Sequence, residues 1–217
     1  MISRVAEIGL THIQYDSSCH KPSHCRRPYP GVLDRLLDQI MATTPQPSVH
    51  IRPAKFPEDR EVVSALFLAY EQFILDFASL TLDFQNFANE VASLPGKYAQ
   101  ENRGALYIAY LKGPPLLASK SAGADVPIGC VGLRAFSEHS AELKRVYLSP
   151  ESRGLGVGRM LVDVAIGKAR ELGYGEILLD TLGSMTAARG LYVKCGFVEM
   201  ESYYESVSDA VFYRLRL

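Results

Sequence analysis

Three glycines within five residues, Gly154, Gly156 and Gly158, place the strongest restriction on how this chain folds. They lie between a predicted strand and a segment whose apolar spacing predicts a long helix. Glycine lets the backbone approach a ligand closely, and the first turn of a helix adds a partial positive charge. The stretch from Arg153 to Arg159 therefore predicts an anion cradle suited to a pyrophosphate, with a turn that needs glycine only for steric reasons as the alternative.

Two common nucleotide-binding motifs do not fit this turn. A Walker loop ends in Gly-Lys-Ser/Thr, whereas Gly158 is followed by Arg159 and Met160. A dinucleotide fold has Gly-x-Gly-x-x-Gly after its first strand, whereas these glycines are spaced by two and follow three predicted strands and two predicted helices. The pattern therefore disfavours both a nucleoside triphosphate and a dinucleotide.

Regular secondary-structure signals begin at Val49. The long helix after the glycines is predicted to end at Gly173 and to bury Met160, Leu161, Val164, Ala165, Lys168 and Leu172. Further helices are predicted over 57–77 and over 186–195. Between them, one more helix is predicted to begin at a cap, Thr81 or Asp83, and to end at Leu94. Strands are predicted over 49–52, 104–111, 128–136, 142–148, 175–180, 197–203 and 210–217.

Residues 1–47 differ from the rest in composition and predict a largely disordered extension of a domain that covers 48–217. Within the extension, Cys19, His20, His24 and Cys25 are residue types that bind zinc. Their spacing lacks the longer loop between ligand pairs, so we expect a solvated tail and no metal site. An alternative start of the native chain at Met41 stays open.

Composition excludes several classes of protein. The chain of 217 residues carries 23 basic and 24 acidic side chains, a net charge of −1, which gives no basis for a nucleic-acid partner. No apolar run approaches the ~18 residues that a membrane span needs. Four scattered cysteines and a start without a secretory signal indicate a reducing compartment. We therefore expect a cytoplasmic protein that binds neither nucleic acid nor membrane.

Two motifs resemble a known family. The stretch 153–158 fits the Arg/Gln-x-x-Gly-x-Gly/Ala signature of the GNAT superfamily of N-acetyltransferases, and 191–197 matches its Leu-Tyr-x-x-x-Gly-Phe segment. The resemblance covers about residues 48–217. It implies an α/β (α+β) GNAT fold, in which about four helices flank a mixed, mostly antiparallel sheet of six to seven strands that splays apart at the cofactor site.

The resemblance also implies acetyl-CoA as co-substrate. The pantetheine arm is expected to lie in the splayed sheet against Val146, Tyr147 and Leu148, beside Tyr192. The pyrophosphate is expected at the glycine turn, which consists of Arg153, Gly154, Leu155, Gly156, Val157, Gly158 and Arg159.

Two residues are candidates for catalysis. An alkyl ammonium has a pKa of about 10.4, so a group that accepts its proton is useful to give the neutral nitrogen that attacks the thioester. Glu142 is the candidate, and strand alternation predicts that it shares one face with Lys144 and Val146. In this interpretation, Glu142 accepts the proton directly or through ordered water; a structural ion pair is the alternative.

Tyr192 matches the tyrosine acid of the family, which hydrogen-bonds to or protonates the leaving thiolate. Its alternative role is that of a core aromatic.

The resemblance places the acceptor between the first two helices, the loop that follows them over 94–98 and the last strands, with Tyr70, Tyr98, Tyr203 and Tyr204 as substrate-binding candidates. Glu71 and Asp76 lie near this region and would suit a small cationic amine, although helix surfaces carry such charges routinely. The expected function is direct acetyl transfer to a primary amine of a small molecule, amino acid or peptide, in a monomer or homodimer. A protein N-terminal or lysine acetyltransferase and a non-catalytic acyl-CoA-binding domain are the alternatives.

Overall fold

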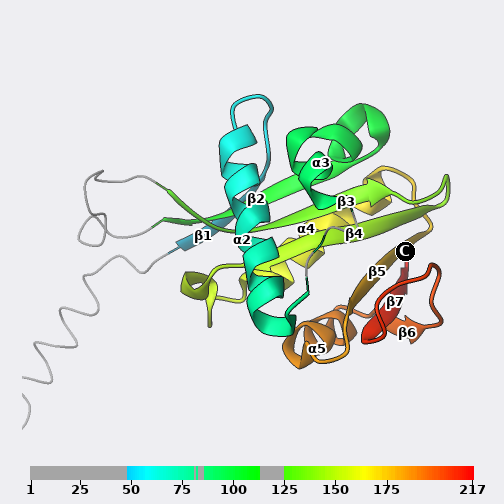
Figure 1. Ribbon diagram of the computed structural model, residues 1–217. Helices are drawn as coiled ribbons and strands as arrows, with labels where there is room; N and C mark the ends of the chain where they lie inside the picture. Colours follow the sequence, from blue (N-terminus) through cyan, green and yellow to red (C-terminus); the bar gives the residue numbers. More distant parts are fainter. Residues whose placement is uncertain (1–47, 81, 83–85, 113–124) are drawn as a thin grey trace, which may run out of the picture. The chain divides into compact units, whose positions relative to one another are not determined.

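A seven-stranded sheet forms the centre of the part of the chain that the computed structural model describes, residues 48–80, 82, 86–112 and 125–217 (Figure 1). Its strand order is β1-β2-β3-β4-β5-β7-β6. Neighbouring strands run antiparallel except β4 and β5, which are parallel. The strands are β1 Ser48–Pro53, β2 Ala105–Lys112, β3 Val126–Ala135, β4 Ser140–Leu148, β5 Glu176–Leu182, β6 Val198–Met200 and β7 Ala210–Arg216.

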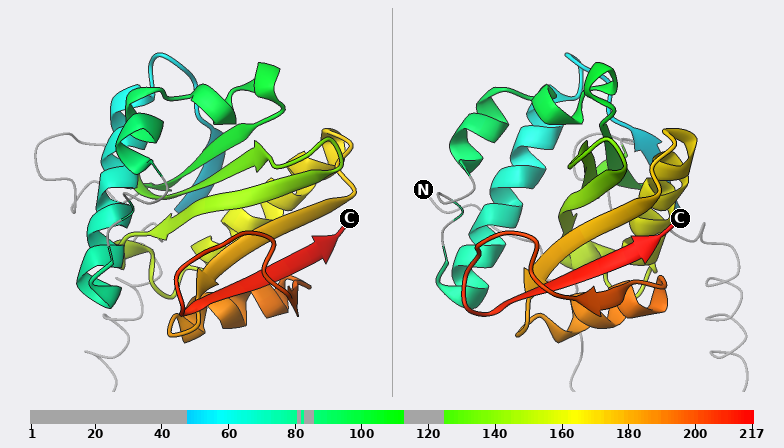
Figure 2. Two further views of the ribbon diagram at one scale, coloured as in Figure 1. Left: turned by 45° about the vertical axis from the view of Figure 1, so that its right-hand side comes forward. Right: turned by 90° about the vertical axis from the view of Figure 1, so that its right-hand side faces the viewer.

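Helices cover both faces of the sheet (Figure 2). The helices α2 and α3 contribute to one apolar cluster, and α4 and α5 contribute to a second cluster on the opposite face. The α-helices are α2 Arg60–Ala78, α3 Phe87–Ala92, α4 Val157–Glu171 and α5 Thr186–Lys194, and the short 3-10 helices are η2 Gly96–Tyr98, η3 Gln100–Asn102 and η4 Pro150–Ser152.

The predicted strands and helices are found at the predicted places, but one helix is shortened and the strand predicted over 197–203 forms only over Val198–Met200. The helix predicted to run to Leu94 is α3, which begins after Asn86 and ends at Ala92. Its predicted caps, Thr81 and Asp83, lie outside the described residues, as do the predicted extension 1–47, the cysteine and histidine cluster within it, and the alternative start at Met41.

The predicted buried face of α4 was correct at Leu161 and Ala165 but otherwise lies one residue position away from the observed face. Met160 is 37% exposed, whereas Val162, Ile166 and Ala169 are buried together with Leu161. The missed positions include the strongly apolar Val162 and Ile166, so both neighbouring stripes of this helix carry apolar side chains. Hydrophobicity alone therefore does not identify the buried face.

Candidate active site

The sheet opens between β4 and β5. Backbone pairing joins Ser140–Glu142 to Glu176–Leu178 and then stops, although β4 continues to Leu148 and β5 to Leu182. In the described residues, the strand ends beyond this point therefore present N–H and C=O groups that the facing strand does not satisfy. An extended ligand can bind there as an added strand would.

A cleft of about 370 Å³ lies at this opening. One wall comes from α2 and the residues that follow it, and the other from the end of β5 and the first turns of α5. Residues 143–148 of β4 line it between these walls, and Ser206 and Val207 close one end. Because α2 and α5 cover opposite faces of the sheet, the cleft gives access to the open strand ends from both faces.

A bulge in β4 sets the direction of this strand. The pairing with β3 passes from Gly132↔Lys144 to Cys130↔Tyr147, so Arg145 and Val146 together face one residue of β3. Arg145 has a φ of 57°, which few residues other than glycine adopt. Strict alternation is therefore broken, and the prediction that Val146 shares a face with Glu142 was wrong. Val146 packs instead against the cluster on the α4 face of the sheet.

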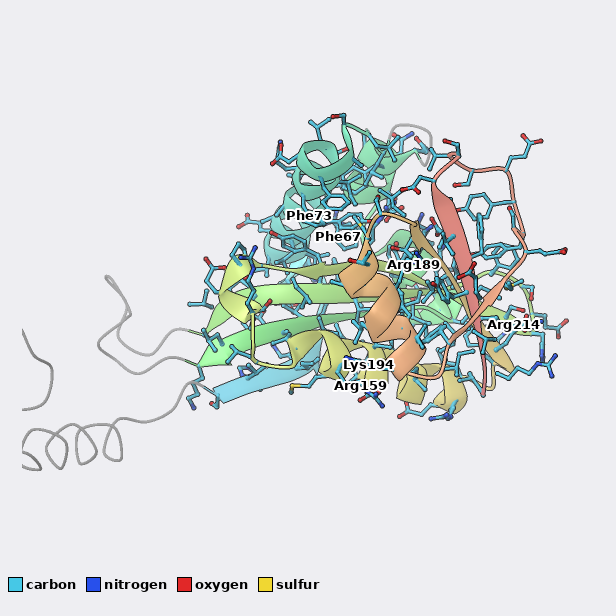
Figure 3. All side chains as sticks on the ribbon, turned by 90° about the horizontal axis from the view of Figure 1, so that it is seen from below. Phe67, Phe73, Arg159, Arg189, Lys194 and Arg214 are labelled. Atoms are coloured by element: carbon cyan, nitrogen blue, oxygen red, sulfur yellow. The ribbon has the colours of Figure 1, made fainter. Side chains whose placement is uncertain are left out.

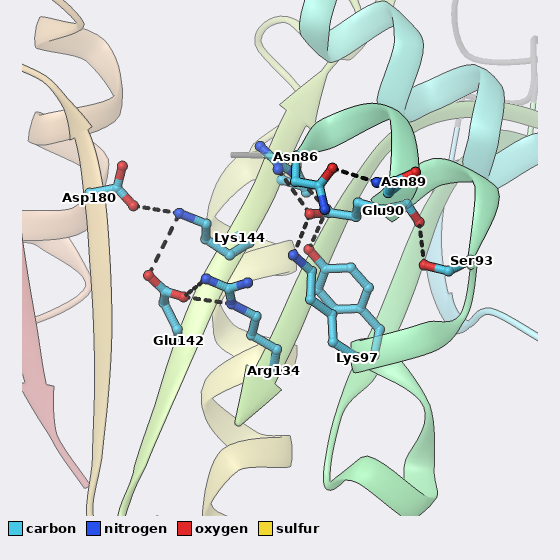
Figure 4. A network of polar contacts seen from close by, with 11 residues as sticks. Asn86, Asn89, Glu90, Ser93, Lys97, Arg134, Glu142, Lys144 and Asp180 are labelled. Atoms are coloured by element: carbon cyan, nitrogen blue, oxygen red, sulfur yellow. Dashed lines mark hydrogen bonds and ion pairs between the residues drawn. The ribbon is translucent and has the colours of Figure 1, made fainter. Parts of the chain in front are cut away.

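Buried ionic contacts hold the bulge to α3 (Figure 4). The Arg145 guanidinium donates to the two Glu90 carboxylate oxygens at 2.8 and 3.0 Å, and both side chains are at most 3% exposed. The Tyr98 hydroxyl donates to Glu90 at 2.8 Å, and Lys97 forms a further ion pair with it. Burial opposes ionisation of Glu90, but the hydrogen bonds and charge of Arg145, with those of Lys97, lower its pKa to about 2.

Glu142 lies in a second ionic cluster and not on the cleft wall. Its side chain is 1% exposed, and it accepts hydrogen bonds from Arg134 Nε at 2.6 Å and from the Tyr203 hydroxyl at 3.0 Å. Lys144 Nζ lies 3.6 Å from it (Figure 4). These contacts favour the structural ion pair, one of the two roles that the sequence left open. Its role as a proton acceptor stays a prediction.

Tyr192 lines the cleft from α5. Its ring packs against Phe197 and Tyr213, with centroid distances of 5.9 and 6.3 Å. Burial raises the pKa of its phenol, and the nearby Tyr70 and Asp180 raise this pKa further. The hydroxyl therefore stays protonated at neutral pH and can donate a hydrogen bond to a group in the cleft.

Asp180 is a cleft residue that the sequence analysis did not single out. It stands near the end of β5, and its carboxylate accepts a hydrogen bond from Lys144 Nζ at 2.7 Å. Burial would raise its pKa, but the charge and hydrogen bond of Lys144 outweigh burial and lower the pKa below 3.8. Its place in the cleft follows from the break in β4–β5 pairing. A single aspartate in a predicted strand does not by itself indicate a functional residue.

The four tyrosines predicted to bind substrate lie in three different environments. Tyr70 lines the cleft from α2. Tyr203 and Tyr204 make edge-to-face contacts with Phe212, and the Asp180 carboxylate adds to the effect of burial in raising the pKa of Tyr204. Tyr98 does not line the cleft, because its ring packs directly on Gly132, where a Cβ would come within 2.6 Å of it. Tyr98 is a core residue with its hydroxyl bound to Glu90.

The glycine turn lies directly before α4. Gly154 and Gly156 have φ values of 73° and 70°, and Gly156 is the N-cap of the helix. A Cβ added at either position would meet no atom within 4 Å, so open space lies in front of this backbone. Val157 and Gly158 open the helix, and their N–H groups have no partner within its first turn. This is the geometry of an anion site at a helix N-terminus.

Other residues of the turn have structural contacts. A Cβ on Gly158 would come within 3.1 Å of the Leu148 and Leu191 side chains, so glycine is needed there for close packing. The Arg159 guanidinium donates to Asp163 at 2.8 Å and to the Lys194 carbonyl at 2.8 Å. The second contact places the first turn of α4 beside the last residue of α5 (Figure 3).

Comparison with known proteins decides the family. The model of the acetyltransferase (GNAT) family matches residues 83–197. An uncharacterized N-acetyltransferase of Schizosaccharomyces pombe is 33% identical over 176 residues, which cover 78% of this chain and 96% of that protein. The chain belongs to the GNAT family. It is therefore an acyltransferase of the N-acetyltransferase type, and the predicted GNAT fold is confirmed, including the number of strands and the splayed sheet.

Solved structures support the GNAT fold. One from Salmonella typhimurium, determined with its cofactor acetyl-CoA, has a TM-score of 0.55 and 20% identity and covers 77% of this chain and 93% of that chain. A structure of the NatC complex bound to Gag peptide and CoA has a TM-score of 0.54 and 22% identity, with coverage of 78% and 99%. At these identities the likeness concerns the fold alone.

The described residues of this GNAT chain contain no group of three or more His, Cys, Asp or Glu side chains placed to hold a metal ion. No helix among them has both the length and the apolar character that crossing a membrane requires.

Proposed function

We propose that this protein is an acetyl-CoA-dependent N-acetyltransferase that transfers the acetyl group directly to a primary amine of a small molecule, amino acid or peptide. The observation that carries the proposal is the cleft where β4 and β5 separate, because it joins open strand ends to the glycine turn through Gly158 and Leu148. A thioester donor bound to both features has its reactive end next to Tyr192.

The residues present suit a coenzyme A molecule. The backbone of Val146, Tyr147 and Leu148 is proposed to hydrogen-bond to the pantetheine arm, and the turn from Arg153 to Arg159 to hold the diphosphate. The open space in front of Gly154 and Gly156 leaves room for that anion. When bound, the coenzyme supplies an activated acetyl group as a thioester.

The proposed reaction is a single displacement. The neutral amine nitrogen attacks the thioester carbonyl carbon, a C–N bond forms, and collapse of the tetrahedral intermediate breaks the C–S bond. Tyr192 donates a hydrogen bond or its proton to the departing sulfur. The amine nitrogen loses one proton through ordered water, toward Glu142 as predicted or toward solvent. Asp180 is a weak base at its lowered pKa, and its proposed role is to orient the amine.

A screen of amines with acetyl-CoA, in which the release of free thiol is followed, tests this proposal. We expect turnover with at least one class of primary amine and mass spectrometric detection of its N-acetyl product. Binding of coenzyme A without turnover on any amine or peptide would support the non-catalytic acyl-CoA-binding alternative. A cytoplasmic location and a monomeric or homodimeric state stay predictions.

A peptide N-terminus is a second candidate acceptor. It is favoured by the likeness in fold to the NatC complex, whose structure contains a peptide and CoA. Protein N-terminal acetylation would use the same cleft and the same residues. Peptides with a free N-terminus should therefore be included in the screen beside small amines, with N-terminally blocked lysine peptides as a third arm.

Substitution of Gly156 by alanine is expected to raise the dissociation constant of coenzyme A by about 10-fold or more, because a Cβ enters the space proposed for the diphosphate. Gly173→Ala is the matched control. Gly156 has a φ of 70° and Gly173 a φ of 76°, and a Cβ at either position would face open space. Gly156 precedes α4, whereas Gly173 lies beyond its other end. Both variants should lose a similar ~1 kcal/mol of stability.

Isothermal calorimetry at low salt measures the two affinities. Equal affinity of Gly156→Ala and Gly173→Ala for coenzyme A would show that the diphosphate does not bind at this turn.

A further inference from the structure

Apart from Tyr70, the wall that α2 contributes to the cleft is apolar. Phe73, Ile74 and Phe77 line it, and Leu80 and Leu82 continue the surface beyond the helix. The Phe73 and Phe77 rings stack at a centroid distance of 5.8 Å, yet the two residues are 45% and 48% exposed. Large apolar side chains that remain exposed beside a cleft indicate a binding surface for an apolar group.

The charged side chains of the cleft belong to β4 and β5 and already have partners; among them, the Arg145 guanidinium also lies 5.6 Å from the centre of the Tyr70 ring on α2. Asp180 binds Lys144 at 2.7 Å, and Arg145 binds Glu90 at 2.8 Å. The acidic residues that the sequence associated with a cationic amine do not line the cleft. Of these, Asp76 is exposed and accepts a hydrogen bond from Gln72 at 2.7 Å. The cleft therefore has a polar end at Asp180 and an apolar side along α2.

We propose that the acceptor is a primary amine attached to an apolar body, aliphatic or aromatic. This inference rests on the proposed function and adds the substrate class to it. The amine nitrogen lies beside Asp180, near the thioester, while the body packs on Phe73, Ile74 and Phe77. An acceptor with a second cationic group loses affinity, because that group must leave water to lie on the apolar wall.

Three amines of matched chemistry test the class. Hexylamine and 1,6-diaminohexane have the same chain length and differ by one ammonium group, and ethylamine lacks most of the apolar body. We expect kcat/KM for hexylamine to exceed that for each of the others by about 10-fold or more. Equal or higher kcat/KM for the diamine overturns the proposal, as does equal kcat/KM for ethylamine.

A primary amine attached to an apolar body can be a small molecule or the N-terminus of a peptide. Leu-Gly-Gly and Asp-Gly-Gly extend the test to peptides, because they share a backbone and differ in the first side chain, which is apolar in one and anionic in the other. The proposal predicts that Leu-Gly-Gly is the better substrate by about 10-fold. Higher kcat/KM for Leu-Gly-Gly than for hexylamine identifies a peptide source, and the reverse order identifies a small amine. Preference for Asp-Gly-Gly overturns the inference.

Variants of α2 show whether the wall itself gives the selectivity. Phe73→Ala and Phe77→Ala should each raise the KM for hexylamine by about 10-fold and leave the KM for acetyl-CoA within about twofold. Leu68→Ala is the control, because Leu68 is 52% exposed on the same helix and does not line the cleft. It should change neither constant.

The possible failures can be told apart. Absence of acetylation of every amine and peptide, with the chain folded, contradicts the proposed function and this inference with it. Turnover that does not respond to Phe73→Ala or Phe77→Ala, or that favours the diamine, contradicts this inference alone and leaves the acetyltransferase function intact.

Discussion

Replacing Tyr192 with phenylalanine is expected to lower kcat by about 100-fold while the affinity for coenzyme A changes by less than about threefold. The substitution removes only the hydroxyl, and the ring contacts to Phe197 and Tyr213 are kept. The raised pKa of Tyr192 keeps its proton in place, so the hydroxyl is available as a donor when negative charge develops on the departing sulfur. A group that acts mainly in the transition state affects kcat more than binding.

Steady-state kinetics at saturating acetyl-CoA, with calorimetry for coenzyme affinity, measures this effect. Tyr107→Phe serves as the control, because Tyr107 lies on β2, is partly buried against the α4-side cluster and does not line the cleft. It should retain full activity. Unchanged kcat in Tyr192→Phe would remove this residue from the mechanism and leave it as a core aromatic.

The second large effect concerns stability. Glu90→Ala is expected to lower the free energy of unfolding by about 3–5 kcal/mol, because it leaves the Arg145 guanidinium charged and buried without its main carboxylate partner. Tyr98 also loses its hydrogen bond, and α3 loses its ionic contact with the bulge of β4. Glu199→Ala is the control. Its ion pair with Arg189 at 3.4 Å is largely exposed, so its loss should cost less than ~1 kcal/mol.

Urea unfolding at pH 7 compares the two variants with the parent chain. A cost for Glu90→Ala no larger than that for Glu199→Ala would show that the buried pair adds no stability beyond a surface ion pair. A double variant, Glu90→Met with Arg145→Met, should recover part of the loss, since apolar residues can replace a buried ion pair at little cost.

The Glu90 pair also predicts a pH dependence. The pKa of Glu90 is about 2 in the folded chain and 4.5 for an unperturbed carboxyl, so the folded state binds its proton less readily than the unfolded state. The stabilisation is therefore complete above about pH 5 and is lost as the pH falls toward 2. Unfolding free energies at pH 5 and pH 3 should differ less in Glu90→Gln than in the parent chain. An equal difference in both would assign the acid sensitivity to other carboxylates.

Local sequence signals predicted the elements of this fold well and their three-dimensional contacts less well. The glycine turn and the strands around it were predicted correctly because backbone geometry there depends on neighbouring residues. The bulge at Arg145 was not predicted, since nothing in the surrounding sequence shows that an arginine adopts a φ of 57°. Its cause lies in residues distant along the chain, such as Glu90, which lies 55 residues earlier and binds its side chain.

The candidate site shows the same division. Tyr192 was identified by a motif, and the structure places it on the cleft. Glu142 was chosen by strand alternation, which cannot reveal that Arg134 on the neighbouring strand binds it at 2.6 Å. Asp180 was missed because its place in the cleft depends on where two strands separate, a property of neither strand alone.

The short β4–β5 pairing has a mechanical consequence. The four strands on one side of the sheet and the three on the other are linked by three residue pairs of β4 and β5, beside which the Gly175 N–H donates to the His139 carbonyl at 2.9 Å. A ligand that hydrogen-bonds to the free strand ends extends this link and acts as a cross-brace between the two parts. Folding and binding of such a ligand are then coupled by mass action, so the free energy of unfolding rises with the logarithm of the free ligand concentration once this exceeds the dissociation constant.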